Sequence, residues 1–216
     1  MKQEGVKYMT NNPWKEISLD IYEAHMKQED VKQLQALNAM MKQQLNSYPV
    51  KELMILGVAG GNGLEHIDPD HFQTVYGIDI NEDYLQSASQ RYAHLSNILK
   101  LQCIDLCTQY QLLPHADFIV ADLLIEYIGI ECFKDIIRHV KPKYISCIIQ
   151  IDYDDEWVSN TAYHDAFQGL QQLHQRIDGE RLSEAMQKLS YTLLLTHSQS
   201  LPNHKELLRL DFQYND

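Results

Sequence analysis

The sequence lacks long apolar runs and is poor in basic side chains. None of its 216 residues belongs to an apolar run of the roughly 20 residues that span a membrane, and the N-terminal MKQEGVKYMT has no signal-peptide core. Basic residues number 18 against 30 acidic ones, a net charge of −12, whereas nucleic-acid binding needs a basic face. We therefore expect a cytoplasmic protein that binds neither membranes nor nucleic acid.

Cysteine is also scarce, and its spacing carries no motif. The four cysteines form no CxxC pair, and the ten histidines include no HExxH or comparable ligand spacing. We predict reduced thiols and no bound metal. The cysteines are Cys103, Cys107, Cys132 and Cys147.

Glycine is infrequent as well, yet four of the nine glycines fall within Gly57–Gly63. The apolar run Leu53–Leu56 before them predicts a strand buried on both faces. Without Cβ atoms the loop can bring its backbone close to a ligand, and residues 64–67 read as the first turn of a helix with free N–H groups. A second strand over 74–78 ends at Asp79. This order is typical of a nucleoside-binding half-unit, whose acid accepts hydrogen bonds from the ribose hydroxyls.

At these residues the chain resembles the class I S-adenosylmethionine-dependent methyltransferases. The family's loop usually reads acid-x-Gly-x-Gly-x-Gly. Aligning it on Gly61-Asn62-Gly63 places Ala59 at the first glycine and Gly57 at the acid, and both are departures. The missing acid would have anchored the amino group of the cofactor, S-adenosyl-L-methionine. The resemblance therefore implies that the methionine end is held in another way.

The rest of the chain predicts a single Rossmann-like α/β domain. Apolar residues at three- and four-residue spacing indicate amphipathic helices over about 15–27 and 29–47. We expect residues 1–48 to form an N-terminal helical cap and 49–216 the cofactor-binding domain. Strands alternating with helices indicate a doubly wound, seven-stranded, mostly parallel sheet, and the resemblance implies an antiparallel last strand. The remaining strands are expected over 98–104, 116–121, 144–151, 190–197 and 207–214, and helices over 81–94, 130–140, 162–176 and 181–188.

Acids follow three successive strands, and the carboxyl ends of parallel strands meet in one crevice. Asp79 is expected to bind the ribose. By the resemblance, Asp105 would accept from the adenine amino group while Ile104 or Leu106 packs the ring. Asp122 follows the fourth strand and is expected to contact the substrate or the methionine amino group. The predicted cofactor-binding residues are Gly57, Ala59, Gly61, Asn62, Gly63, Asp79, Ile80, Asp105, Leu106 and Asp122.

Methyl transfer from a sulfonium requires alignment, exclusion of water and, for some acceptors, removal of a proton. It needs no obligatory catalytic residue, so the sequence only nominates possible bases. Glu126 and Tyr127 face this region or are ordinary helix-start residues. The four acids in 152–157 would suit a cationic or amine substrate, or form a solvated loop. Candidate bases are Tyr22, His25 and Tyr153, with Tyr163 and His164.

Two other functions remain open from the sequence. A nicotinamide-dependent oxidoreductase also uses an acid after the second strand, but the pattern here runs Gly61-x-Gly63-x-x-His66 and lacks the third glycine. A non-catalytic cofactor-binding or scaffold protein is favoured by the altered loop. For a methyltransferase we expect a small-molecule acceptor, because the chain is short and acidic. The apolar N-terminal helices would allow a homodimer.

Overall fold

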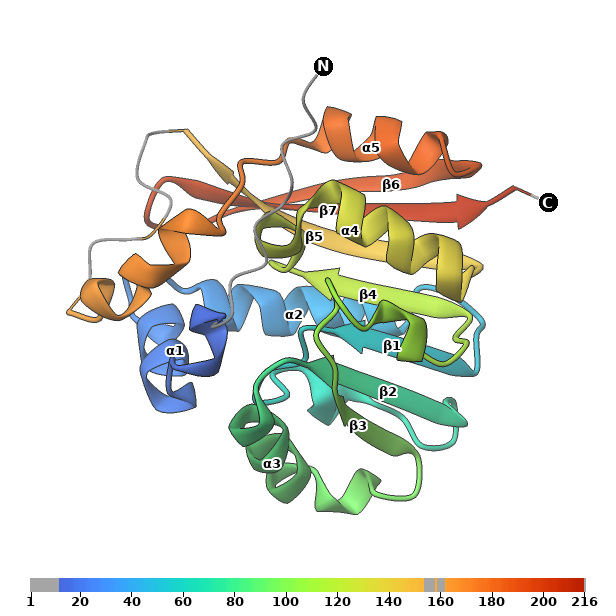
Figure 1. Cartoon of the computed structure of the whole chain (residues 1–216), viewed down its shortest axis with the longest axis horizontal. Helices are drawn as coiled ribbons and strands as arrows, with labels where there is room; N and C mark the ends of the chain where they lie inside the picture. The colour runs from blue at the N-terminus through green and yellow to red at the C-terminus, as the bar shows by residue number, and fades with distance from the viewer. Residues whose placement is uncertain (1–11, 154–157, 159–161, 216) are drawn as a thin grey trace.

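A seven-stranded sheet runs through the computed structural model, which describes residues 12–153, 158 and 162–215 (Figure 1). The strand order within these residues is β3-β2-β1-β4-β5-β7-β6. The strands are β1 (Glu52–Leu56), β2 (Thr74–Asp79), β3 (Leu99–Cys103), β4 (Phe118–Asp122), β5 (Tyr144–Asp152), β6 (Tyr191–Ser200) and β7 (Lys205–Tyr214).

Strands β1 to β5 pair in parallel, and β7 inserts antiparallel between β5 and β6. This confirms the Rossmann-like, doubly wound, mostly parallel sheet with an antiparallel last strand. The central strands β1 and β4 and most of β5 are apolar and buried, as expected where helices cover both faces of a parallel sheet, whereas β3 at the edge is partly exposed.

Alternate residues of each strand belong to opposite faces of the sheet. Leu53 and Ile55 of β1 pack with residues of α2 (Gln33–Leu45) and α3 (Glu82–Arg91). Met54 and Leu56 pack with residues of α4 and α5 on the other face. The two-residue period of a strand thus divides the core into two layers. Helices α4 and α5 span Ile125–Val140 and Gly179–Gln187.

The N-terminal segment forms a short 3-10 helix, η1 (Pro13–Lys15), followed by α1 (Leu19–Lys27) and then α2. Lys32, between α1 and α2, has φ 49°, a left-handed conformation that a helix interior does not contain. Helix α2 therefore begins at Gln33 rather than at the expected residue 29. Helix α2 packs into the sheet, whereas η1 and α1 gather with η5 (His164–Gln172) at one end of it (Figure 1). We call η1 and α1 the cap.

Three expected helices differ from the structure. Residues 64–67 make only a 3-10 turn, η2 (Leu64–His66), because Pro69 cannot supply the N–H that continues a helix. The helix expected over 162–176 is the 3-10 helix η5. Helix α4 begins at Ile125 rather than 130, with a break at Gly129 (φ 78°, ψ 157°). Among the described residues, no helix is both long and apolar enough to cross a membrane.

Candidate functional site

Two acids flank Gly57 in one row across the sheet. The register pairs Leu56 of β1 with Ile78 of β2 and with Ala121 of β4. The next residues along these strands are Asp79, Gly57 and Asp122. Because neighbouring strands lie about 4.8 Å apart, the backbones of the two acids are about 10 Å apart. Gly57, where the resemblance expected an acid, therefore has a carboxylate on either side.

Asp79 is held by the backbone around it and is only 8% exposed. Its Oδ2 accepts from the Ala59 N–H at 2.8 Å, and its Oδ1 accepts from the Asn81 N–H at 2.9 Å. Among the described residues, no lysine or arginine pairs with it. Burial raises the pKa of Asp79, and its backbone hydrogen bonds oppose that rise only in part. A carboxylate accepts about four hydrogen bonds, so Asp79 retains capacity for a further donor.

The glycines at the end of the loop make room for the protein's own side chains. A Cβ on Gly61 would lie 2.7 Å from the Tyr92 ring, and one on Gly63 would lie 2.6 Å from Met41 Sδ. Both glycines also have positive φ, 88° and 96°. Asn62 donates from Nδ2 to the Leu34 carbonyl at 3.0 Å. The cofactor-binding roles of Gly61, Asn62 and Gly63 therefore stay predictions, while their packing role is clear.

The first residues of the loop lie nearer the row of acids. Ala59 adopts φ 46° despite its Cβ, and this turn directs its N–H to Asp79. Gly57 has φ 70°, and a Cβ there would lie 3.2 Å from Leu124 after β4. The backbone from Gly57 to Ala59 thus borders the carboxyl ends of β2 and β4.

Asp122, at the end of β4, belongs to a hydrogen-bond network with Gln44 of α2 and Ser146 of β5. Its Oδ1 accepts from Gln44 Nε2 at 2.8 Å, and the same nitrogen donates to Ser146 Oγ at 3.0 Å. Burial raises the pKa of Asp122 to about 7, against the opposing effect of the Gln44 bond. The side chain of Asp122 is therefore positioned by Gln44 of α2.

The predicted adenine-binding residues occupy less distinctive positions. Asp105 Oδ1 accepts from the Cys107 N–H at 3.0 Å, which makes a local turn. Leu106 is 6% exposed and belongs to the core layer below α4. Ile80 is half-buried beyond the end of β2. Their contacts with a cofactor stay predictions.

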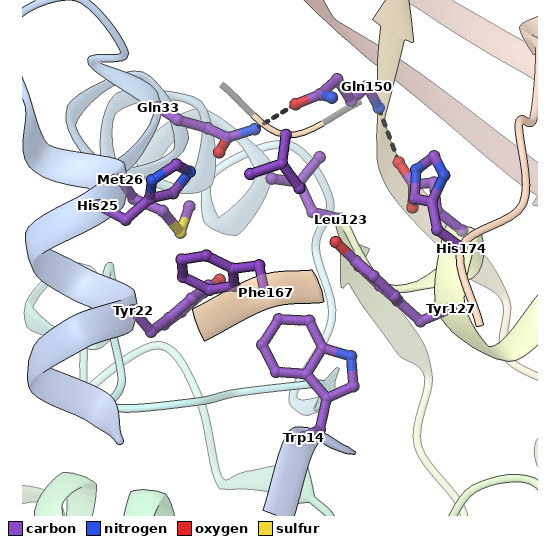
Figure 2. Close-up of a pocket in the computed structure, with 12 residues that line it drawn as sticks. Trp14, Tyr22, His25, Met26, Gln33, Leu123, Tyr127, Gln150, Phe167 and His174 are labelled. Carbon is purple, nitrogen blue, oxygen red and sulfur yellow. Dashed lines mark hydrogen bonds between the residues drawn. The ribbon is translucent and has the colours of Figure 1, made fainter. Parts of the chain in front are cut away.

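A cavity opens under the cap (Figure 2), and its lining includes Leu123, the residue after Asp122. Its free volume is about 60 Å³, enough for a few water molecules and smaller than a typical site for a drug-sized ligand. Its walls come from six elements, η1, α1, α2, the start of α4, β5 and η5, and from three residues outside them, Leu123, Val158 and His174. They contribute Trp14, Tyr22, His25, Met26, Gln33, Leu123, Glu126, Tyr127, Gln150, Val158, Phe167 and His174.

Glu126 is the acid of this cavity, and it is 3% exposed. Its Oε1 accepts from the Gln150 N–H at 2.7 Å, while within the described part of the chain Oε2 has no hydrogen-bond partner. Burial raises the pKa of Glu126 to about 7, and the nearby acids Asp152 and Asp122 add to the rise. A carboxyl group with a pKa near neutrality can both hold and release a proton.

Aromatic rings form much of the remaining wall. The Trp14 ring stands perpendicular to those of Tyr22 and Tyr127, with centroids 5.6 Å and 4.9 Å away. Figure 2 shows Phe167 and Tyr127 on either side of the space above Trp14. The Trp14 carbonyl also accepts from Asn81 Nδ2 at 2.9 Å, which ties the cap to the end of β2.

The structure separates the candidate bases. Tyr22 and His25 line the cavity together, and burial lowers the pKa of His25. Tyr153 does not line it. That side chain is 72% exposed, and its hydroxyl donates to Glu206 Oε2 at 3.0 Å. Most of the acidic stretch, 154–157, lies outside the described residues.

Sequence reasoning missed several walls of the cavity. Trp14, Gln33, Phe167 and His174 come from segments far apart in the chain, and no local spacing relates them. The apolar residues around Phe167 were a possible signal for a cavity wall, but the same pattern is equally typical of a helix that packs in the core. For Glu126 and Tyr127 the sequence left open whether they face this region or only start a helix, and in the structure both line the cavity.

No protein-family description matches the sequence, and no curated protein matches it. Solved structures do match. Magnesium protoporphyrin IX methyltransferase from Synechocystis PCC 6803, with bound SAH, aligns at a TM-score of 0.66 and 14% identity over 91% of this chain and 93% of that one. The N-methyltransferase NodS from Bradyrhizobium japonicum WM9 aligns at a TM-score of 0.60 and 15% identity over 84% and 96%.

The chain has the class I S-adenosylmethionine-dependent methyltransferase fold. The cyclase SpnF shares this fold, with a TM-score of 0.63 and 12% identity over 85% of this chain and 82% of SpnF. A methyltransferase fold therefore does not fix the reaction, which has to be argued from the site.

Proposed function

We propose that this protein binds S-adenosylmethionine and transfers a methyl group to a small-molecule acceptor. The observation that carries the proposal is the buried carboxylate of Asp79, fixed by the Ala59 and Asn81 N–H groups at the end of β2. A buried carboxylate without a basic partner is costly unless a ligand supplies donors. Two neighbouring ribose hydroxyls are donors that suit its two oxygens.

Asp122 is the residue that we assign to the methionine end. The usual acid is absent at Gly57, but Asp122 stands in the same row one strand away. Its carboxylate, held by Gln44, would attract the ammonium group of the amino acid. Asp79 and Asp122 would thus bind the ribose and the amino-acid part of the cofactor, on either side of Gly57, which has no side chain.

When bound, the cofactor supplies a methyl group already activated by its sulfonium. The chain's task is to place an acceptor beside it and keep water out. The cavity under the cap lies next to the row of acids and is closed by aromatic side chains. Glu126 lies in its wall, where it can take a proton from an acceptor.

The strand order disfavours the nicotinamide alternative. Dinucleotide-binding sheets end with a parallel sixth strand, in the order 3-2-1-4-5-6, whereas here β7 inserts antiparallel between β5 and β6. The loop also places His66 where that fingerprint has its third glycine. Cofactor binding without methyl transfer remains a separate outcome of the experiment below.

Calorimetry with S-adenosylmethionine, S-adenosylhomocysteine and NADH tests the cofactor. We expect the first two to bind and NADH not to bind. Asp79→Ala should weaken both by at least about tenfold, because a charge-assisted hydrogen bond contributes about 1.5–3 kcal/mol. Asp117→Ala is the matched control, since Asp117 lies beside the opposite end of β4 and is partly exposed.

Methyl transfer is tested with radiolabelled S-adenosylmethionine and a small-molecule extract. Label should appear in an extract component only when the folded protein is present. Unchanged affinity in Asp79→Ala would contradict the assignment of the site. Tight cofactor binding without labelled product would leave a binding protein and reject the transferase.

A further inference from the structure

Among the described residues, the lining of the cavity under the cap combines one acid with aromatic walls and contains no lysine or arginine. Glu126 is the only carboxylate among the lining residues, and its Oε2 lacks a partner within the described part of the chain. Gln150 and Gln33 are bonded to each other at 2.7 Å, from Gln33 Nε2 to Gln150 Oε1. Within the described part of the chain, Glu126 Oε2 is thus a buried acceptor to which no side chain donates.

The two histidines of the lining do not compensate this charge. Burial lowers the pKa of both His25 and His174, which favours their neutral forms. Lys205, a basic side chain that acts on His174, already pairs with Asp152 at 2.7 Å. An ionised Glu126 would therefore leave the cavity negative, and a cationic ligand would balance it.

The aromatic rings suit the same kind of ligand. Trp14 presents its ring between Tyr22 and Tyr127, which stand perpendicular to it on two sides. Faces of such rings attract ammonium groups, and the attraction strengthens where water is excluded. Phe167 closes a further side (Figure 2). The cavity has the composition of an aromatic cage with a carboxylate at one wall.

We propose that this cavity binds the amino group of a small aliphatic amine, with Glu126 pairing with its ammonium form and the rings of Trp14, Tyr22 and Tyr127 surrounding it. This inference rests on the proposed function, because the amine would be the acceptor of the methyl group. Glu126 then accepts one proton from the ammonium: an N–H bond breaks, a carboxyl O–H bond forms, and the nitrogen lone pair becomes free to be methylated.

Binding of n-propylamine, compared with its neutral analogue propan-1-ol, tests this inference. Calorimetry gives the affinities, with and without saturating S-adenosylhomocysteine. Tryptophan emission gives the location in a Trp157→Phe background, where Trp14 is the only tryptophan of the chain. We expect the amine to bind at least about tenfold more tightly than the alcohol and to change the Trp14 emission.

Glu126→Gln removes the charge and keeps an oxygen for the Gln150 N–H. It should lower the affinity for the amine about tenfold or more and leave that for the alcohol unchanged. Glu131→Gln is the matched control, because Glu131 lies on the same helix with its side chain 81% exposed and paired with Lys134. Equal affinities for amine and alcohol, or an unchanged affinity for the amine in Glu126→Gln, would overturn the proposal and leave the rings as packing for the cap.

Affinity for the amine should also fall as the pH is lowered from 8 to 6, as Glu126 becomes protonated, and this fall should be smaller in Glu126→Gln.

The outcomes separate the two proposals. Failure of S-adenosylhomocysteine to bind rejects the proposed function, whereas its binding without amine preference rejects only the amine. The other titratable or charged groups around Glu126 are Tyr22, His25, Asp122, Tyr127, Asp152, His174 and Lys205.

Discussion

Arg91 on α3 pairs with Glu23 on α1 through both of its terminal nitrogens, and the Arg91 Nη2 to Glu23 Oε2 distance is 3.0 Å. Arg91 Nη1 also donates to the Gly60 carbonyl at 3.3 Å. The pair therefore joins the cap to the body of the protein directly over the glycine loop. A ligand that reaches the loop from this side must pass the contact between these two residues.

Breaking this pair should loosen the cap. We expect Glu23→Gln to speed association of S-adenosylhomocysteine by about two- to fivefold, since a partly exposed ion pair contributes up to about 1 kcal/mol. Stopped-flow binding measures the rate. High salt should reduce the difference between the variant and the parent protein, because exposed charges are screened. Equal association rates in the two proteins would place the entry route elsewhere.

Alanine at Gly61 should destabilise the protein by about 2–4 kcal/mol, from the positive φ and the clash with Tyr92. Urea unfolding measures the loss. Gly169→Ala is the matched control, because a Cβ there meets nothing closer than 3.4 Å. A neutral Gly61→Ala would show that Tyr92 moves aside readily and that the glycine is not required for packing.

Replacing Asp211 by asparagine should cost about 3–5 kcal/mol of unfolding free energy, because it leaves Arg209 buried without its counterion. The two side chains are 0% and 2% exposed. Tyr48 also donates its hydroxyl to Asp211 Oδ2 at 2.7 Å. Thermal or urea unfolding checks the value against Glu131→Gln, whose exposed pair should change stability by less than about 1 kcal/mol.

Stability should fall as the pH rises from about 5 to 7. The pKa of Glu126 is raised from 4.5 to about 7 by burial, so the native state binds more protons than the unfolded state in this window. The contribution is about 3 kcal/mol for a shift of this size, and it opposes folding above the native pKa. Asp122 acts in the same direction.

Urea unfolding at pH 5 and pH 7.5 measures this dependence. Glu126→Gln should flatten it and should raise stability at pH 7.5, since the unpaired buried charge is removed. A variant as pH-sensitive as the parent protein would show that Glu126 ionises without penalty. That outcome would require a donor at its Oε2.

Local sequence was sufficient for most of the strands and for the acids at their ends, whereas the antiparallel last strand was expected only from the family resemblance. Apolar runs such as Leu53–Leu56 can be read directly as buried strands, and parallel strands bring their carboxyl ends to one edge, which places Asp79 and Asp122 together. The helix expected after Gly63 was wrong, because Pro69 stops it. Whether a segment forms a helix or a strand follows from the spacing of its apolar residues, whereas its length can depend on a single residue such as Pro69.

Only the tertiary structure decided what surrounds those acids. The sequence could not show that Met41 and Tyr92 fill the space beside two glycines, or that Trp14, Glu126 and Phe167 meet in one cavity. These contacts join segments distant in the chain, and side-chain packing in three dimensions determines them. The chain's own pattern thus specified the strand ends and their acids, and the folding of the cap over them formed the cavity.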